Sequence, residues 1–266
     1  MHVARKRFGQ HFLHDPGVIA RIVAAIDPRP GERLVEIGPG LGAITLPLLT
    51  RVPELHAIEI DRDAIRHLRA ITGESAALHI HEADALEFDL AGLDDGRGLR
   101  VVGNLPYNIS TPLLFRLIEQ RRHLRDMHVM LQKEVVERMA AAPDTEHYGR
   151  LTVMLAPWLR VEPLFDIGPG AFRPPPRVTS TFVRLAPHAE PLRIEQPRCY
   201  ANVVAAAFSQ RRKTLRNALR TLGLDAGEVE ALGRAAGVDL GLRAERLDVA
   251  AFAALARNVD PAAGRG

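Results

Sequence analysis

Short apolar runs along the chain alternate with segments whose apolar positions recur at helical spacing. The compact runs have the length and composition of buried strands, whereas the periodic segments predict amphipathic helices. Asp15-Pro16 and Thr111-Pro112 each place a capping residue before a proline, which is a common start of a helix. Six strands are predicted. The first begins at residue 33, two span residues 55–60 and 77–81, the fourth ends at residue 104, and the last two span residues 127–131 and 181–185. This alternation predicts a doubly wound α/β fold.

The pattern changes after a polar, proline-containing stretch at residues 186–197. Beyond it the apolar spacing is helical, without a convincing strand. The predicted helices cover residues 200–208, 212–222, 226–236 and 248–258. We therefore predict a Rossmann-like catalytic domain at 1–189 and a small all-helical domain at 190–266.

A glycine-rich turn follows the first predicted strand, with the sequence EIGPGLG around Gly38, Gly40 and Gly42. Glycines at such a turn let the backbone approach a ligand closely. Their spacing is G-x-G-x-G, whereas dinucleotide sites use G-x-G-x-x-G, so the turn fits S-adenosylmethionine (SAM) better than NAD. Glu59 lies near the end of the next strand, where a carboxylate can accept from ribose hydroxyls. Asp84 follows the third strand, and we expect it to accept from the amino group of the cofactor's adenine.

The fourth strand ends in Asn-Leu-Pro-Tyr, residues 104–107, and this motif suits methylation of an amino group on a flat base. The exocyclic amine of adenine is a poor nucleophile because its lone pair is delocalised into the ring. The Asn104 side-chain carbonyl and a backbone carbonyl at Leu105 or Pro106 are placed to accept the two amine hydrogens. Tyr107 offers a ring on which an unstacked base can lie. We therefore interpret Asn104, Leu105, Pro106 and Tyr107 as the catalytic turn.

Two later segments carry candidate RNA contacts. In FRPPPRV, three consecutive prolines exclude regular helix, so Phe172 lies in a loop where it either supplies a second wall for the target base or caps the core. Arg173 or Arg177 would then meet phosphate. In FSQRRKTLRNAL, we select Arg211, Arg212 and Lys213 as the outer RNA contact. The i,i+4 spacing also predicts one helical face for a basic stripe that comprises Arg212, Arg216 and Arg220.

Taken together, RKRFGQHFL, VEIGPGLG, IEIDRD, NLPYNIS, LQKEV, FRPPPRV and FSQRRKTLRNAL resemble the KsgA-type (RsmA) ribosomal RNA adenine dimethyltransferases over nearly the whole chain. The resemblance implies a SAM-dependent enzyme of ribosome biogenesis. Its substrate would be 16S rRNA in the small subunit or its precursor, with two methyl groups placed on each of two adjacent adenosines in the 3′-terminal hairpin loop. The cofactor residues that it implies are His11, Leu13, Gly38, Glu59, Asp84 and Asn104.

Composition agrees with this interpretation. The chain has 266 residues, a formal net charge of +3 and a single cysteine, so an internal disulfide framework is excluded. The basic start of the chain lacks an apolar signal region, and no run approaches the ~20 apolar residues of a membrane helix. We expect a cytoplasmic, soluble and monomeric protein that acts away from membranes. His79 and His81 lack further ligands at metal spacing, so we expect no metal site.

Three alternatives stay open at the level of sequence. A macrolide-resistance type methyltransferase of large-subunit rRNA shares the catalytic fold, although Leu105, Asn108 and the FSQRRKT segment favour the small-subunit enzyme. A non-catalytic assembly or transcription factor would keep the fold and the basic surface for binding alone. An NAD-dependent oxidoreductase is disfavoured by the glycine spacing.

Overall fold

The computed structural model describes residues 11–73 and 75–259, and these form two compact units. The first unit contains residues 11–136 and Arg160–Pro187. The second contains Glu137–Leu159 and residues 188–259. The basic cluster Arg5-Lys6-Arg7 lies outside the described residues.

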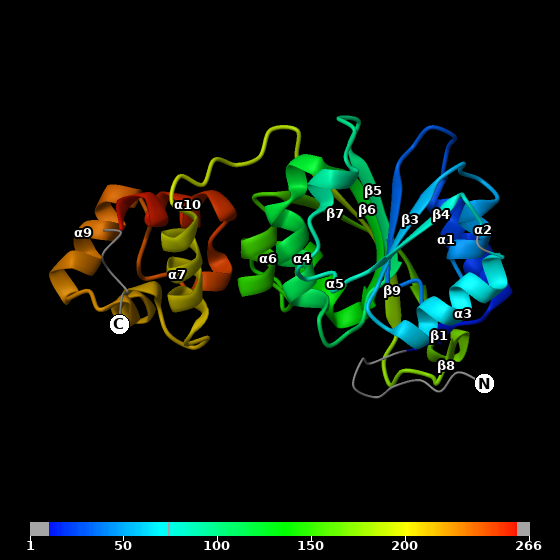
Figure 1. Ribbon diagram of the computed structural model, residues 1–266. Coiled ribbons are helices and arrows are strands. Elements are labelled where there is room, and N and C mark those ends of the chain that lie inside the picture. The colour runs from blue at the N-terminus through cyan, green and yellow to red at the C-terminus, as the bar shows by residue number, and fades with distance from the viewer. Residues whose placement is uncertain (1–10, 74, 260–266) are drawn as a thin grey trace. The chain divides into compact units, whose positions relative to one another are not determined.

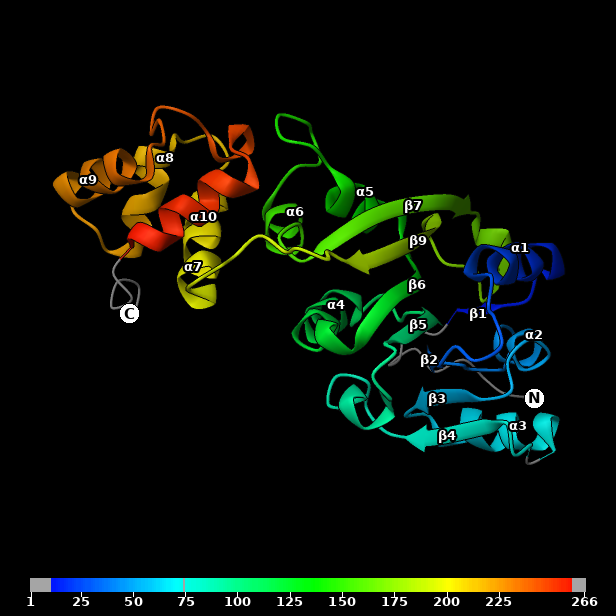
Figure 2. The same ribbon diagram turned by 90° about the horizontal axis from the view of Figure 1, so that it is seen from above.

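The first unit is built on a seven-stranded sheet with the order β4-β3-β2-β5-β6-β9-β7 (Figure 2). Its strands are β2 Leu34–Ile37, β3 Leu55–Glu59, β4 Leu78–Glu82, β5 Leu99–Asn104, β6 Leu124–Gln132, β7 Leu159–Ile167 and β9 Ser180–Pro187. The strands from β4 to β6 are parallel, and β9 is antiparallel to β6. The chain runs outward from β2 through β3 and β4, then crosses to the other side of β2 at β5. The carboxyl ends of β2 and β5 therefore flank a topological switch point, where open α/β sheets bind ligands.

Helices cover both faces of this sheet. Helices α1 Pro16–Ile26, α2 Thr45–Leu49 and α3 Arg62–Thr72 lie on one face, and α4 Ser110–Glu119 lies on the other (Figures 1 and 2). Helix α1 begins as predicted, because the Asp15 side chain accepts a hydrogen bond of 3.0 Å from the Val18 amide. The predicted cap at Thr111 is wrong: α4 begins at Ser110, and Ile109 is the cap residue without a side-chain bond.

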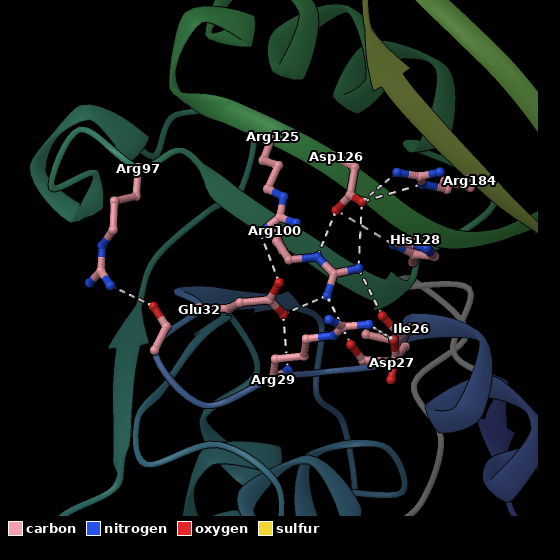
Figure 3. A network of polar contacts seen from close by, with 11 residues as sticks. Ile26, Asp27, Arg29, Glu32, Arg97, Arg100, Arg125, Asp126, His128 and Arg184 are labelled. Carbon is pink, nitrogen blue, oxygen red and sulfur yellow. Dashed lines mark hydrogen bonds and ion pairs between the residues drawn. The ribbon is translucent and has the colours of Figure 1, made fainter.

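A buried network of polar contacts joins β5 and β6 near their amino ends, away from the switch point (Figure 3). The Arg100 guanidinium donates to Asp126 at 2.9 Å, to Glu32 at 2.7 Å and to the carbonyl of Ile26 at 2.8 Å. Although burial opposes the shift, the contacts with Arg100 hold the pKa of Asp126 below its usual range, and the Arg29 backbone amide together with Arg100 lowers the pKa of Glu32. Arg184 on β9 also donates to Asp126, at 3.2 Å, so the network extends to a third strand.

The predicted strands are all present, but β7 was not predicted. Only its two end residues, Leu159 and Ile167, are buried, and the residues between them are exposed or partly exposed. A sheet-edge strand of this kind lacks the continuous apolar run by which buried strands are recognised. A small second sheet joins β1 Phe12–Leu13 to β8 Phe172–Arg173, with Leu13 opposite Phe172.

The second unit is helical and contains α6 Arg150–Leu155, α7 Pro197–Phe208, α8 Leu215–Ala218, α9 Ala226–Ala236 and α10 Val249–Asn258. Helix α5 Lys133–Ala140 precedes α6 in the chain, and the boundary between the two units falls within it, after Val136. The hydroxyl of Tyr148 donates to the Leu247 carbonyl and that of Tyr200 to the Val153 carbonyl, both at 2.7 Å. Glu137–Leu159 therefore shares a core with the C-terminal helices, whereas the predicted division at 189/190 had placed it in the catalytic domain.

The helix predicted at 212–222 is partly wrong. Residues 211–213 form a turn, α8 begins only at Leu215, and a 3₁₀ helix follows at Leu219–Leu222. In the part of the chain that the structure describes, no helix combines the length and apolar character needed to cross a bilayer.

Candidate active site

The carboxyl ends of β2, β3, β4 and β5 meet at one cavity of about 270 Å³. This volume lies near the lower end of the range for small-molecule sites. All six predicted cofactor residues and all four residues of the predicted catalytic turn line it: His11, Leu13, Gly38, Glu59, Asp84, Asn104, Leu105, Pro106 and Tyr107. Segments far apart along the chain are thus brought to one edge of the sheet.

The glycine turn forms the floor of the cavity next to β2. Gly38, Gly40 and Gly42 all have positive φ angles, of 68°, 53° and 83°. A β-carbon at Gly40 would lie 3.2 Å from the ring of Phe12, so a side chain there would be both strained and crowded. The turn is held by bonds of 3.0 Å from the Gly38 amide to the Ile58 carbonyl and of 2.9 Å from the Gly42 amide to the Pro39 carbonyl.

Glu59 closes the cavity at the end of β3 and is 8% exposed. Its carboxylate accepts from the backbone amides of Gly40 at 3.2 Å, Ile60 at 3.0 Å and Asp61 at 2.9 Å. Burial raises the pKa of Glu59, while these three amide donors act in the opposite direction. The bonds fix the carboxylate between the glycine turn and the start of α3, with further lone pairs available to a ligand.

Glu36 on β2 is a second acid in the cavity wall, and sequence reasoning missed it. Its side chain is 1% exposed, and its carboxylate accepts a bond of 2.6 Å from the Thr45 hydroxyl. Burial raises the pKa of Glu36 to about 7; the Thr45 bond lowers it, and the charge of Glu59 raises it further. An acid inside an otherwise apolar strand was the available signal, because carboxylates are almost never fully buried without a reason.

Asp84 stands at the far side of the cavity, after β4. One carboxylate oxygen accepts from the Leu86 amide at 2.9 Å, and the Asp84 carbonyl accepts from the amides of Glu87 and Phe88 at 3.0 Å. Gln120 holds the continuation of this loop, because its side chain donates to the Phe88 carbonyl and accepts from the Leu90 amide. Asp84 is therefore presented by a tightly hydrogen-bonded turn.

The amide of Asn104 has a defined orientation at the end of β5. Its Nδ2 donates to the backbone carbonyl of His11 at 2.9 Å, so the donor side of the amide is occupied and Oδ1 remains as the acceptor. The Pro106 carbonyl already accepts from the Ile109 amide at 3.2 Å. Of the two backbone acceptors considered from the sequence, the Leu105 carbonyl is thus the better partner for a second amine hydrogen.

Tyr107 lies beside Asn104 and is partly buried. The rings of Tyr107 and His11 have centroids 5.6 Å apart, and the His11 Nδ1 is 2.8 Å from the Pro174 carbonyl. The Tyr107 hydroxyl shares a hydrogen bond of 2.5 Å with that of Ser180, and burial raises its pKa. His11 therefore contacts two residues of the catalytic turn, Asn104 through its backbone carbonyl and Tyr107 through its ring.

Phe172 does not face the cavity. It is 1% exposed and packs in the core with Leu13 and Phe182, so the prediction that it forms a second wall for the target base is corrected, and the alternative of a core residue holds. Two arginine residues of the same FRPPPRV segment are exposed, in contrast to Phe172. Arg173 and Arg177 are exposed on either side of the buried Pro176.

Arg211, Arg212 and Lys213 are all exposed, and they lie in the turn between α7 and α8 of the second unit. The predicted basic stripe is wrong, because Arg212 precedes the helix and Arg216 is paired with Glu230 of α9. The described residues include no group of three or more His, Cys, Asp or Glu side chains positioned to bind a metal ion.

The family model described as "Ribosomal RNA adenine dimethylase" matches residues 1–260. The chain belongs to this family. A relative from Aromatoleum aromaticum, the "Ribosomal RNA small subunit methyltransferase A", is 57% identical over 255 residues, which cover 96% of this chain and 93% of that protein. The family match confirms the prediction from the sequence that this protein is a methyltransferase. It does not support the alternative of an NAD-dependent oxidoreductase.

Two solved structures are similar over nearly their whole length. A dimethyladenosine transferase from Plasmodium falciparum has a TM-score of 0.76 at 26% identity and covers 92% of this chain and 96% of its own. The 23S rRNA methyltransferase ErmE has a TM-score of 0.68 at 25% identity, with 93% and 98% covered. The predicted Rossmann-like methyltransferase fold is confirmed.

Proposed function

We propose that this ribosomal RNA adenine dimethylase transfers methyl groups from SAM to two adjacent adenosines in the 3′-terminal hairpin loop of 16S rRNA, during assembly of the small ribosomal subunit. The observation that carries the proposal is the orientation of Asn104. Its Nδ2 donates to the His11 carbonyl, which leaves Oδ1 as the side-chain atom that accepts from an adenine amine at the edge of the cavity.

The donor set of the cavity fits SAM. Two buried carboxyl groups, Glu36 and Glu59, suit a ligand with positive charge and ribose hydroxyls. Asp84 supplies an acceptor on the opposite wall, and apolar side chains such as Leu13 and Leu86 line the space between. When bound, SAM would supply an electrophilic methyl carbon, so the chain needs to position the amine and needs no strong base.

The residues of the catalytic turn have different roles in positioning the target adenine. Asn104 Oδ1 and the Leu105 carbonyl each accept one amine hydrogen, which localises the nitrogen lone pair toward the cavity. Tyr107 supplies a stacking surface, worth about 1–3 kcal/mol per base in single-stranded sites. The target adenine must reach this turn from a loop or be flipped out of a helix. After alkylation the amine is acidic and loses its proton to water, so Asn104 acts as an acceptor throughout.

The small-subunit substrate is favoured over a large-subunit one by the identity of the relatives. The chain is 57% identical to a protein named for the small subunit, against 25% to a structure named for 23S rRNA. The exposed cluster Arg211, Arg212 and Lys213 provides the charge for contacts with RNA phosphates outside the catalytic cavity.

Mass spectrometry of rRNA from a strain that lacks this gene tests the proposal. We expect the two adjacent dimethyladenosines of 16S rRNA to be absent in the deletion strain and restored by the wild-type gene. A gene carrying Asn104→Ala serves as the matched control and should not restore them, which also separates catalysis from a purely structural role in assembly. Unchanged 16S rRNA together with altered 23S rRNA would favour the large-subunit alternative.

A further inference from the structure

Ser180 reaches the catalytic turn from a distant part of the chain. It is the first residue of β9, which runs antiparallel to β6, so the amino end of β9 lies beside the carboxyl end of β6. Ser180 pairs with Gln132 in this register and is 0% exposed. The antiparallel direction of β9 thus brings a residue 73 positions beyond Tyr107 to the edge of the sheet that carries the cavity.

The Ser180 hydroxyl lies 2.5 Å from the hydroxyl of Tyr107. The backbone of Tyr107 is also held, because the Ser110 hydroxyl donates to its carbonyl at 3.1 Å. The ring is thus restrained at both ends, by Ser110 at the backbone and by Ser180 at the phenol oxygen. The chain between Tyr107 and Ser180 includes β6 and β7, so the restraint depends on the assembled sheet.

From this geometry we propose that Ser180 is a positioning residue for methyl transfer, which holds the ring of Tyr107 at the angle where the target adenine stacks. The inference rests on the proposed function, since it assumes that a base lies on Tyr107. Near-attack geometry is sensitive to displacements of the order of 1 Å. Loss of one hydrogen bond at the phenol oxygen frees the ring to rotate, while leaving its stacking area unchanged.

The chain offers a matched control one residue away. Thr181 is also buried on β9, and its hydroxyl donates to Asp166 on β7 at 2.6 Å. Neighbouring residues of a strand point to opposite faces of the sheet. The Thr181 side chain therefore points away from the face on which Ser180 contacts Tyr107. Thr181→Val removes a buried hydroxyl from the same strand without touching the catalytic turn.

The test is a double-mutant cycle on the single-turnover methylation rate, with saturating SAM and small-subunit precursor. We expect Ser180→Ala and Tyr107→Phe each to lower the rate about tenfold, the effect of roughly one hydrogen bond. The double variant should be no slower than either single variant, within about twofold. Thr181→Val should keep the wild-type rate, and SAM affinity, measured by calorimetry, should be unchanged in all four proteins.

Several results would overturn the inference: a wild-type rate in Ser180→Ala, additive losses in the double variant, or an equal loss in Thr181→Val. If Ser180→Ala fails to fold, Tyr107→Phe tests the same bond from its other partner, and a wild-type rate there overturns the inference. A wild-type protein that leaves the precursor unmethylated would overturn the proposed function as well. Failure of the inference about Ser180 can therefore be distinguished from failure of the proposed function.

Discussion

At the scale of single residues, Glu36 links cofactor binding to pH. Burial raises its pKa to about 7, so the free protein takes up a proton there as the pH falls through neutrality. A cationic ligand in the cavity stabilises the charged carboxylate and lowers this pKa. SAM affinity should therefore rise with pH through about 7 and level off above it, by about tenfold for each unit that SAM lowers the pKa.

Calorimetric titration with SAM over the range from about pH 5.5 to about pH 8.5, which brackets the raised pKa, measures this dependence. Glu36→Gln should bind like wild type at the acid end, where Glu36 is protonated, and more weakly than wild type at the alkaline end. Thr45→Val removes the hydroxyl that donates to Glu36 and should move the transition to higher pH. Parallel curves for wild type and Glu36→Gln would show that another group controls the pH dependence.

Asp84 and Asn104 should affect different steps, although both line the same cavity. Asp84→Ala removes an acceptor for SAM and should weaken SAM binding by about 1–3 kcal/mol, with the protein still folded. Asn104→Ala removes an acceptor for the target amine, so its main effect should be on the single-turnover rate. Calorimetry and single-turnover assays on both variants distinguish the roles; wild-type SAM affinity in a folded Asp84→Ala protein would remove Asp84 from the cofactor site.

At the scale of elements, the closeness of β2 and β5 depends on Gly103. A β-carbon at Gly103 would lie 2.4 Å from the backbone carbonyl oxygen of Ile37 on β2, and a backbone atom cannot move aside as a side chain can. Gly103→Ala should separate these strands at a cost of about 1–3 kcal/mol and weaken SAM binding, since Glu36 and Asn104 lie on them. Gly92→Ala is the control, because nothing lies within 4 Å of its β-carbon position.

Hydrogen exchange of the β2 and β5 amides measures this effect within the first unit. We expect faster exchange in Gly103→Ala and wild-type exchange in Gly92→Ala. Equal protection in both variants would mean that the sheet accommodates the added methyl group.

The network around Arg100 stabilises the opposite ends of the strands (Figure 3). The Arg100 side chain is 7% exposed, and the side chain of its partner Asp126 is 3% exposed. Arg100→Ala removes the buried partner of Asp126 and leaves it only the more exposed Arg184, and breaking a buried ion pair typically costs about 3–5 kcal/mol. Arg97→Ala breaks an exposed pair with Asp95 and should have a much smaller effect, because water screens that pair. Urea unfolding of both variants compares the two effects, and similar values would indicate that the Arg100 network contributes no more than a surface pair.

At the scale of the whole molecule, substrate selection and cofactor binding should be separable. Replacing Arg211, Arg212 and Lys213 by Ala should lower affinity for the small-subunit precursor and flatten its salt dependence. The log–log slope should fall by about 0.7–0.9 for each RNA phosphate that the variant no longer neutralises. SAM affinity should be unchanged, because the cavity belongs to the first unit and these residues belong to the second.

The control for this prediction removes an equal charge elsewhere. Arg62, Arg66 and Arg69 are exposed on α3 of the first unit, and their replacement by Ala should leave the salt slope unchanged. Filter binding over a salt series compares the two triple variants. Equal slopes in both variants and wild type would mean that RNA is selected by other residues.

The sequence by itself determined the features that depend on a few neighbouring residues. The glycine turn after β2, the cap at Asp15, and the positions of Glu59, Asp84 and Asn104 at strand ends follow from local backbone chemistry and apolar periodicity. Parallel strands place such ends at one edge of a sheet, so these three residues could be assigned to one cavity without knowing its geometry.

Tertiary structure decided what depends on distant partners. Phe172 is buried because β8 pairs with β1, which lies far earlier in the chain, and the Asn104 amide is oriented by the carbonyl of His11. The burial of Glu36, the bond between Tyr107 and Ser180, and the membership of Glu137–Leu159 in the helical core have the same origin. Burial and hydrogen bonding depend on which surfaces meet, and the spacing of residues along one strand or helix does not specify its neighbour.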